Sequence, residues 1–128
     1  MQLIQKIYSL IVKEPSKAFL HPAVRKAISY ISQKINTYIT VEEIADLIGL
    51  SPKHLQAIFK QSTGKTPLEY ITEVRLIYTK NCLLSTDLSI AEIAYIHGFS
   101  SCSYFNYVFK KHFNQTPGQF RKFPLNRQ

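Results

Sequence analysis

The side chains with the clearest chemistry in this sequence are two amides and a lysine on the outward faces of two short predicted helices. Gln56 and Asn106 each end in a planar amide that offers a carbonyl acceptor beside an NH2 donor. The edge of adenine offers the complementary pair, and Lys53 can donate to the acceptors of guanine. Such side chains can pair with nucleobases where a fold presents them to nucleic acid.

Cysteine, histidine and acidic residues form no catalytic or metal-binding pattern in this sequence. Cys82 and Cys102 lack the spacing of metal ligands. The histidines are scattered along the chain, at His21, His54, His97 and His112. We expect His97 to pack at a turn and His112 at the edge of the core. The sequence also lacks a glycine-rich phosphate loop, a nucleophile elbow and paired catalytic carboxylates. It therefore predicts a protein that needs no metal or cofactor and is not an enzyme.

The charge of the chain points to a polyanionic partner. Sixteen Lys and Arg residues face eight Asp and Glu residues, which gives a net charge of +8 and a pI of about 9.6. The last acidic residue is Glu92, and five basic residues follow it: Lys110, Lys111, Arg121, Lys122 and Arg127. Such a balance suits nucleic acid or an acidic membrane surface. The basic residues are spread over several elements rather than along one amphipathic helix, which favours nucleic acid.

Neither a membrane span nor an export sequence is predicted. No run approaches the roughly eighteen apolar residues that a span needs. The start of the chain carries Lys6, Lys13 and Glu14 and has no small-residue cleavage site. Two cysteines are too few for a disulfide scaffold, which favours a reducing compartment. We therefore expect a cytoplasmic location and no membrane partner.

Start and stop residues divide the chain into about seven short helices, and no segment alternates as a strand would. Apolar residues recur at three- and four-residue spacing over 22–35. Capping residues, several followed by proline, begin the later helices at Thr40, Ser51, Thr66, Ser89 and Thr116. The predicted fold class is all-α.

The longest predicted helix covers about 67–84, and its eighteen or so residues would span about 27 Å. The apolar positions that sustain this helix are Leu68, Ile71, Val74, Ile77, Tyr78, Leu83 and Leu84. Phenylalanine and tyrosine residues elsewhere stand at helical spacing, so we expect them in the core rather than on a stacking platform for single strands.

The two halves of the chain repeat one unit. A shift of 49 residues places Thr40, Glu43 and Gly49 over Ser89, Glu92 and Gly98. A shift of 50 then matches the later positions, placing Leu55, Phe59 and Lys60 over Phe105, Phe109 and Lys110. Each copy is a capped helix, a glycine turn and a second helix, the pattern of a helix-turn-helix. The copies cover about 40–64 and 89–113.

The chain resembles the DNA-binding domain of the AraC/XylS class of bacterial transcription regulators over about 21–123. The matching residues of the second copy are IAYIHGFS at 93–100, SYF at 103–105, FKKHF at 109–113, TP at 116–117 and FR at 120–121. Those of the first are IA at 44–45, GLSP at 49–52, Leu55, FK at 59–60 and Gly64, with Tyr70 and Arg75 beyond them. The resemblance implies two helix-turn-helix subdomains joined by the long helix, which contact successive major grooves of double-stranded DNA. It further implies a transcription regulator, acting as an activator that also contacts RNA polymerase.

The outward faces of the two recognition helices provide the candidate contacts. The residues that would face the bases are Lys53, Gln56, Ala57, Cys102, Ser103, Asn106 and Tyr107. The residues that would contact the DNA backbone, partly through helix N-terminal amides, are Ser51, Lys60, Lys110, Lys111, Thr116 and Arg121. Arg75 is favoured as a structural brace, paired with a carboxylate such as Glu43 or Glu92.

Four positions depart from the family pattern. Ala57 and Tyr107 stand where relatives often carry a base-contacting arginine, Ser101 replaces an acidic residue, and Asn114 replaces a glycine. Asparagine also tolerates a left-handed helix cap, so the fold is not affected. We expect less preference for guanine, with more of the affinity coming from phosphate contacts.

Residues 1–20 precede the resemblance, and 124–128 form a tail. The first segment carries an apolar helical stripe and Pro15, and we interpret it as a linker or the end of an upstream helix. The chain is then the C-terminal piece of a regulator with an upstream sensing or dimerisation domain, or else a naturally short regulator. The alternative function is a basic module that binds nucleic acid without sequence preference or binds another protein.

Overall fold

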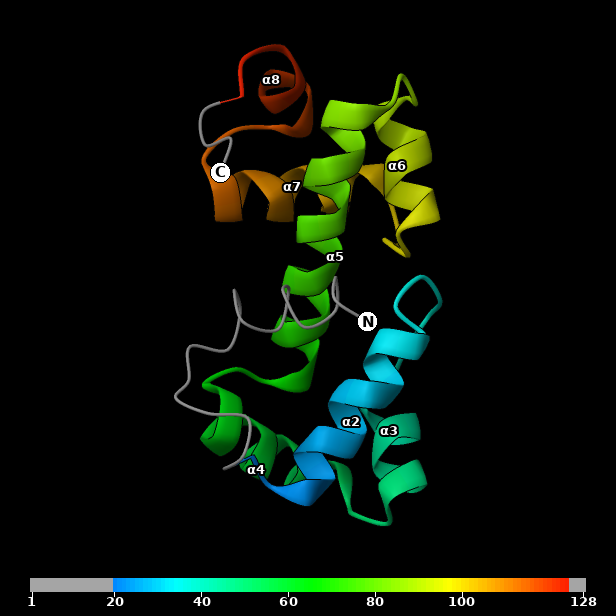
Figure 1. The fold of residues 1–128 in the computed structure, drawn as a ribbon, viewed down its shortest axis with the longest axis vertical. Coiled ribbons are helices and arrows are strands. Elements are labelled where there is room, and N and C mark those ends of the chain that lie inside the picture. Colours follow the sequence, from blue (N-terminus) through cyan, green and yellow to red (C-terminus); the bar gives the residue numbers. More distant parts are fainter. Residues whose placement is uncertain (1–19, 125–128) are drawn as a thin grey trace. The chain divides into compact units, whose positions relative to one another are not determined.

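A computed structural model describes residues 20–124, and within that range all regular structure is helical (Figure 1). The helices are α2 (Pro22–Gln33), α3 (Val41–Ile48), α4 (Pro52–Thr63), α5 (Pro67–Ser85), α6 (Ile90–Ile96), α7 (Cys102–Phe113) and α8 (Pro117–Lys122). The predicted all-α fold with about seven helices is confirmed. None of these helices is long and apolar enough to cross a membrane. The proposed linker at 1–20 lies almost wholly outside the described residues, as does most of the tail.

The chain divides into two compact units, and the boundary falls between Val74 and Arg75, inside α5. In the first unit α2, α3 and α4 pack against one another. In the second unit α6 packs on α7 and α7 packs on α8. Helix α5 therefore supplies its first turns to one unit and its remaining turns to the other (Figure 1).

Local capping explains where most helices begin and end. Complete capping boxes begin α3 at Thr40, α6 at Ser89 and α8 at Thr116, as predicted. Helix α4 begins at the predicted Ser51 cap. Helix α7 ends at Asn114, which caps the helix with a left-handed φ of 62°. The expectation that asparagine tolerates a left-handed cap here is confirmed.

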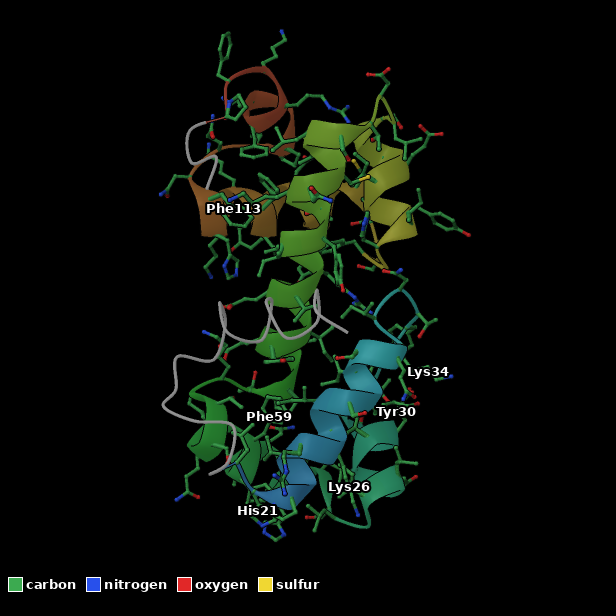
Figure 2. All side chains as sticks on the ribbon, in the orientation of Figure 1. His21, Lys26, Tyr30, Lys34, Phe59 and Phe113 are labelled. Atoms are coloured by element: carbon green, nitrogen blue, oxygen red, sulfur yellow. The ribbon has the colours of Figure 1, made fainter. Side chains whose placement is uncertain are left out.

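The core of the first unit is built from the inward faces of α2, α3 and α4. Val24, Ile31, Ile44, Leu55 and Phe59 are completely buried. Phe59 also packs edge-on against Tyr70 of α5, with ring centroids 5.5 Å apart (Figure 2). This packing turns the opposite face of α4 to solvent.

The core of the second unit is rich in phenylalanine. Phe105, Phe109 and Phe120 are buried together with Leu76 and Leu83 of α5. Rings of Phe109 and Phe113 lie 4.7 Å apart, centroid to centroid. The expectation that aromatic residues belong to the core holds for these side chains. It is wrong for Tyr38 and Tyr95, which are 82% and 83% exposed. Tyr107, which we predicted to face outward, is 61% exposed.

One further expectation about burial is corrected. His112 is exposed rather than at the edge of the core, because its neighbour Phe113 packs against the core of the second unit.

Helix α5 contributes residues to the cores of both units. Leu68 and Leu84 are exposed, whereas Leu76 and Thr79 are buried. A single apolar stripe therefore does not describe which residues of α5 are buried.

Candidate nucleic-acid interface

The recognition helix of the first unit, α4, presents the predicted base-facing residues to solvent. Lys53, Gln56 and Ala57 are exposed, and so is Lys60 one turn further on. Leu55 and Phe59, between them, are completely buried against α2 and α3. The alternation of buried and exposed residues at helical spacing holds the four outward side chains on one face.

The recognition helix of the second unit, α7, presents the matched face. Ser103, Tyr107, Lys110 and Lys111 are exposed, whereas Cys102 and Asn106 are half-buried. The inward residues are Phe105, Val108 and Phe109. Both helices therefore place the predicted residues on a solvent-facing side.

Side chains on the outer face of α7 contact one another one turn apart. The Asn106 amide donates from Nδ2 to Sγ of Cys102 over 3.8 Å. The Lys111 ammonium lies over the ring of Tyr107, 5.8 Å from its centroid. Sequence reasoning placed these residues on one face but did not identify the two pairs, although each has the four-residue spacing of helix neighbours.

Ser51 and Thr116, near which we predicted that helix N-terminal amides contact the DNA backbone, act as helix caps. Oγ of Ser51 accepts from the backbone N–H of His54, and Oγ1 of Thr116 accepts from that of Gln119, each over 3.1 Å. Sequence reasoning missed the equivalent role of Ser101, whose Oγ accepts from the backbone N–H of Tyr104 over 3.0 Å and begins α7. The serine that replaces the family's acidic residue is itself a favourable N-cap, which is how the sequence could have revealed it.

Arg121, predicted to contact the DNA backbone, donates to two backbone carbonyls, one in the last turn of α5 and one just after the helix. Its Nε donates to the carbonyl of Leu83 over 3.1 Å, and its Nη2 donates to that of Thr86 over 3.2 Å. These carbonyls would otherwise lack a helical partner, so Arg121 ties α8 to the C-terminal end of α5.

Arg75, which we favoured as a structural brace, lies against the turn between α6 and α7. Its guanidinium is half-buried in the second unit, where burial lowers the pKa, and it lies close beside the backbone of Gly98. The two carboxylates suggested as partners make capping contacts: Glu43 accepts from the Thr40 amide and Glu92 from the Ser89 amide. Glu43 also accepts from the Tyr30 hydroxyl over 2.5 Å, a contact between α2 and α3 that the sequence did not predict (Figure 2).

Histidine and cysteine side chains form no metal site in the described part of the chain. No three His, Cys, Asp or Glu residues within 20–124 lie together as metal ligands would. His97 is buried at the end of α6, where its Nδ1 lies 2.7 Å from the carbonyl of Ile93. Its predicted packing at a turn is confirmed.

Comparison with known proteins agrees with this arrangement. A family model described as a helix-turn-helix domain matches residues 44–122. "Probable transcription factor PqrA" of Proteus vulgaris is 45% identical over 87 residues, which are 68% of this chain and 71% of that protein. The xylose operon regulatory protein of Escherichia coli K12 is 35% identical over 82% of this chain, but the match covers only 27% of that regulator.

A solved structure shows the same fold. The crystal structure of a transcriptional regulator from Chromobacterium violaceum, described by its AraC-type DNA-binding domain, superposes with a TM-score of 0.71 and 33% identity. The match covers 81% of this chain and 96% of that one. The repeated helix-turn-helix, the capped recognition helices and these relatives together show that the chain belongs to the AraC/XylS family of DNA-binding transcription regulators.

Proposed function

We propose that the chain regulates transcription by inserting α4 and α7 into successive major grooves of double-stranded DNA. The observation that carries this proposal is the matched outer face of the two helices, on which polar residues stand at equivalent positions of a repeated unit. B-DNA presents a new major groove face every 10 base pairs or so, which suits two recognition helices in one chain.

Base contacts are assigned to the exposed side of each helix. Gln56 and Asn106 pair with adenine, Lys53 donates to guanine, and Ala57 packs on a thymine methyl group. Ser103 and Tyr107 complete the base-contacting face of the second helix, and Cys102 lies on the same face beside Asn106. Because neither Ala57 nor Tyr107 can form a bidentate pair with guanine, the preferred sites are poorer in guanine contacts than those of arginine-bearing relatives.

Phosphate contacts supply the remaining affinity. We assign them to exposed Lys60, Lys110 and Lys111, and to backbone amides at the capped helix starts near Ser51 and Thr116. Arg121 is left out of this set because two of its N–H groups already donate to the carbonyls of Leu83 and Thr86.

We infer that this domain acts by binding rather than catalysis, in the cytoplasm, and as an activator that contacts RNA polymerase. A sensing or dimerisation domain controls it, in the same polypeptide or as a partner. This is supported by the xylose operon regulator, in which the similar segment is 27% of the protein.

Selection of bound duplexes from a random pool, repeated across a salt series, tests the proposal. The expected result is a motif of two boxes about 10 base pairs apart, with affinity that falls steeply as salt rises. Salt-sensitive binding without an enriched motif would indicate a non-specific nucleic-acid module instead. Absence of duplex binding at low salt would overturn the proposal.

A further inference from the structure

In the recognition helix of the second unit, the side-chain amide of Asn106 is hydrogen-bonded to a neighbouring side chain. The first unit cannot form the equivalent contact. In α7 the Asn106 amide donates from Nδ2 to the Cys102 sulfur, and both side chains are half-buried. The repeat places Gln56 opposite Asn106 and Pro52 opposite Cys102. The proline ring has no hydrogen-bond acceptor, so the two units differ at an otherwise matched position.

We propose that Cys102 is a positioning residue, which orients the Asn106 amide toward adenine and thereby determines the base preference of the second unit. This inference rests on the proposed contact between Asn106 and DNA. It assigns the thiol a role through its neighbour, in place of a direct contact with a base.

The chemistry of the amide supports a base contact by Asn106 and an orienting role for Cys102. An asparagine that pairs with adenine accepts from N6 through Oδ1 and donates to N7 through the N–H on the same side of the amide. Its second N–H points away from the base and is not used in that pair. The sulfur of Cys102 accepts from Nδ2, so it can take the hydrogen that adenine leaves unused.

The sulfur contact also limits the rotation of the amide. In the structure Nδ2 lies beside the sulfur and donates to it. After a half-turn Oδ1 would lie there and the thiol S–H would become the donor. Both contacts keep the amide beside the sulfur, so the side chain has fewer accessible rotamers before DNA arrives. The Asn106 side chain therefore loses less rotational freedom when DNA binds, which strengthens binding to a duplex with adenine at the contacted position.

A double-mutant cycle on the selected operator tests the proposal, with C102A, N106A and the double variant measured by equilibrium binding. We expect C102A to weaken binding to the preferred duplex roughly two- to fivefold, the effect of losing one weak hydrogen bond. A duplex in which the adenine contacted by Asn106 is replaced should show little effect of C102A. In the N106A background, C102A should have no further effect. The salt dependence should not change in any variant, because no phosphate contact is removed.

Each result has a distinct meaning. If C102A and N106A act additively, Cys102 contacts DNA by itself and the positioning role is wrong. If N106A lowers discrimination but C102A does not, the positioning role alone is overturned. If N106A leaves the base preference unchanged, the proposed contact of Asn106 fails first and the inference fails with it. C82A removes the other half-buried thiol, which lies outside both recognition helices, and should leave the base preference unchanged. Thermal melting of each variant verifies that it is folded.

Discussion

The backbone of Gly98 lies directly against the guanidinium of Arg75. A Cβ atom placed on Gly98 would be 3.1 Å from both Cζ and Nη2 of Arg75, closer than ordinary van der Waals contact. Gly98 also has a backbone φ of +83°, which residues other than glycine rarely adopt. Two independent constraints therefore require glycine at the turn of the second helix-turn-helix.

Gly98→Ala should destabilise the second unit more than Gly49→Ala destabilises the first. Both glycines have left-handed φ values, but a Cβ on Gly49 would meet no atom within 4 Å. We expect Gly49→Ala to lower the free energy of unfolding by about 1 kcal/mol from backbone strain. Gly98→Ala should cost about 1 kcal/mol more, because Arg75 must move.

Urea denaturation followed through backbone amides of each unit would measure both costs. Arg75→Ala provides the control, because it removes the crowding and leaves the strained φ. In the Arg75→Ala background, Gly49→Ala and Gly98→Ala should lower the free energy of unfolding by the same amount. Equal costs with Arg75 present would show that the guanidinium moves aside freely.

The hydrogen bond from Tyr30 to Glu43 should control the titration of that carboxyl group. The pKa of Glu43 is lowered, mainly because its carboxylate accepts from the Tyr30 hydroxyl and then from the Thr40 amide. A pKa that is lower in the folded state adds stability above the unfolded value, and this stability is lost as the pH falls through the folded value. Tyr30→Phe should therefore raise the pKa of Glu43 and weaken the fall in stability below about pH 4.5.

Chemical-shift titration of the Glu43 carboxyl in Tyr30→Phe would measure this change. Tyr38→Phe is the matched control, because the Tyr38 side chain is 82% exposed. An unchanged Glu43 pKa in Tyr30→Phe would mean that the capping contact with Thr40 alone sets it.

Features fixed by a few neighbouring residues were predictable from the sequence, whereas features fixed by distant packing were not. The capping boxes at Thr40 and Ser89 involve residues three positions apart, and both were predicted. The contact of Arg121 with Leu83 joins residues 38 positions apart, and nothing local indicates it. The buried faces of α5 could not be predicted, because one helix contributes to two cores. The outward faces of α4 and α7 were predictable because each helix has one apolar side.

Arg121→Ala should reduce stability without changing the salt dependence of DNA binding. The substitution removes two hydrogen bonds from a charged donor to carbonyls at the end of α5. We expect a loss of about 1–3 kcal/mol in the free energy of unfolding of the second unit. Exposed Lys122, the next residue, provides the control, since Lys122→Ala should change stability little. If the Arg121→Ala variant is as stable as the parent and its DNA binding depends less on salt, Arg121 contacts phosphate, as predicted from the sequence.

Gln56→Ala and Asn106→Ala should each relax the base preference of a different box. Each substitution removes a bidentate pair with adenine, worth about 1–3 kcal/mol of discrimination. Repeating the duplex selection with each variant would show which positions lose their preference. Loss of preference in both boxes from one substitution would mean that the two helices do not contact separate boxes.

Lysines on the recognition helices should contribute to the salt dependence, whereas a lysine of α2 should not. Each phosphate contact releases counterions, so Lys60→Ala or Lys110→Ala should reduce the slope of log affinity against log salt by about 0.9. Lys26 on α2 is also exposed and carries the same charge, which makes Lys26→Ala the matched control. A long-range effect of net charge would alter all three variants alike, because each loses one positive charge. A change in the slope for Lys60 and Lys110 alone therefore identifies direct phosphate contacts by α4 and α7, and an equal change for Lys26 would show that net charge, rather than direct contact, accounts for the slope.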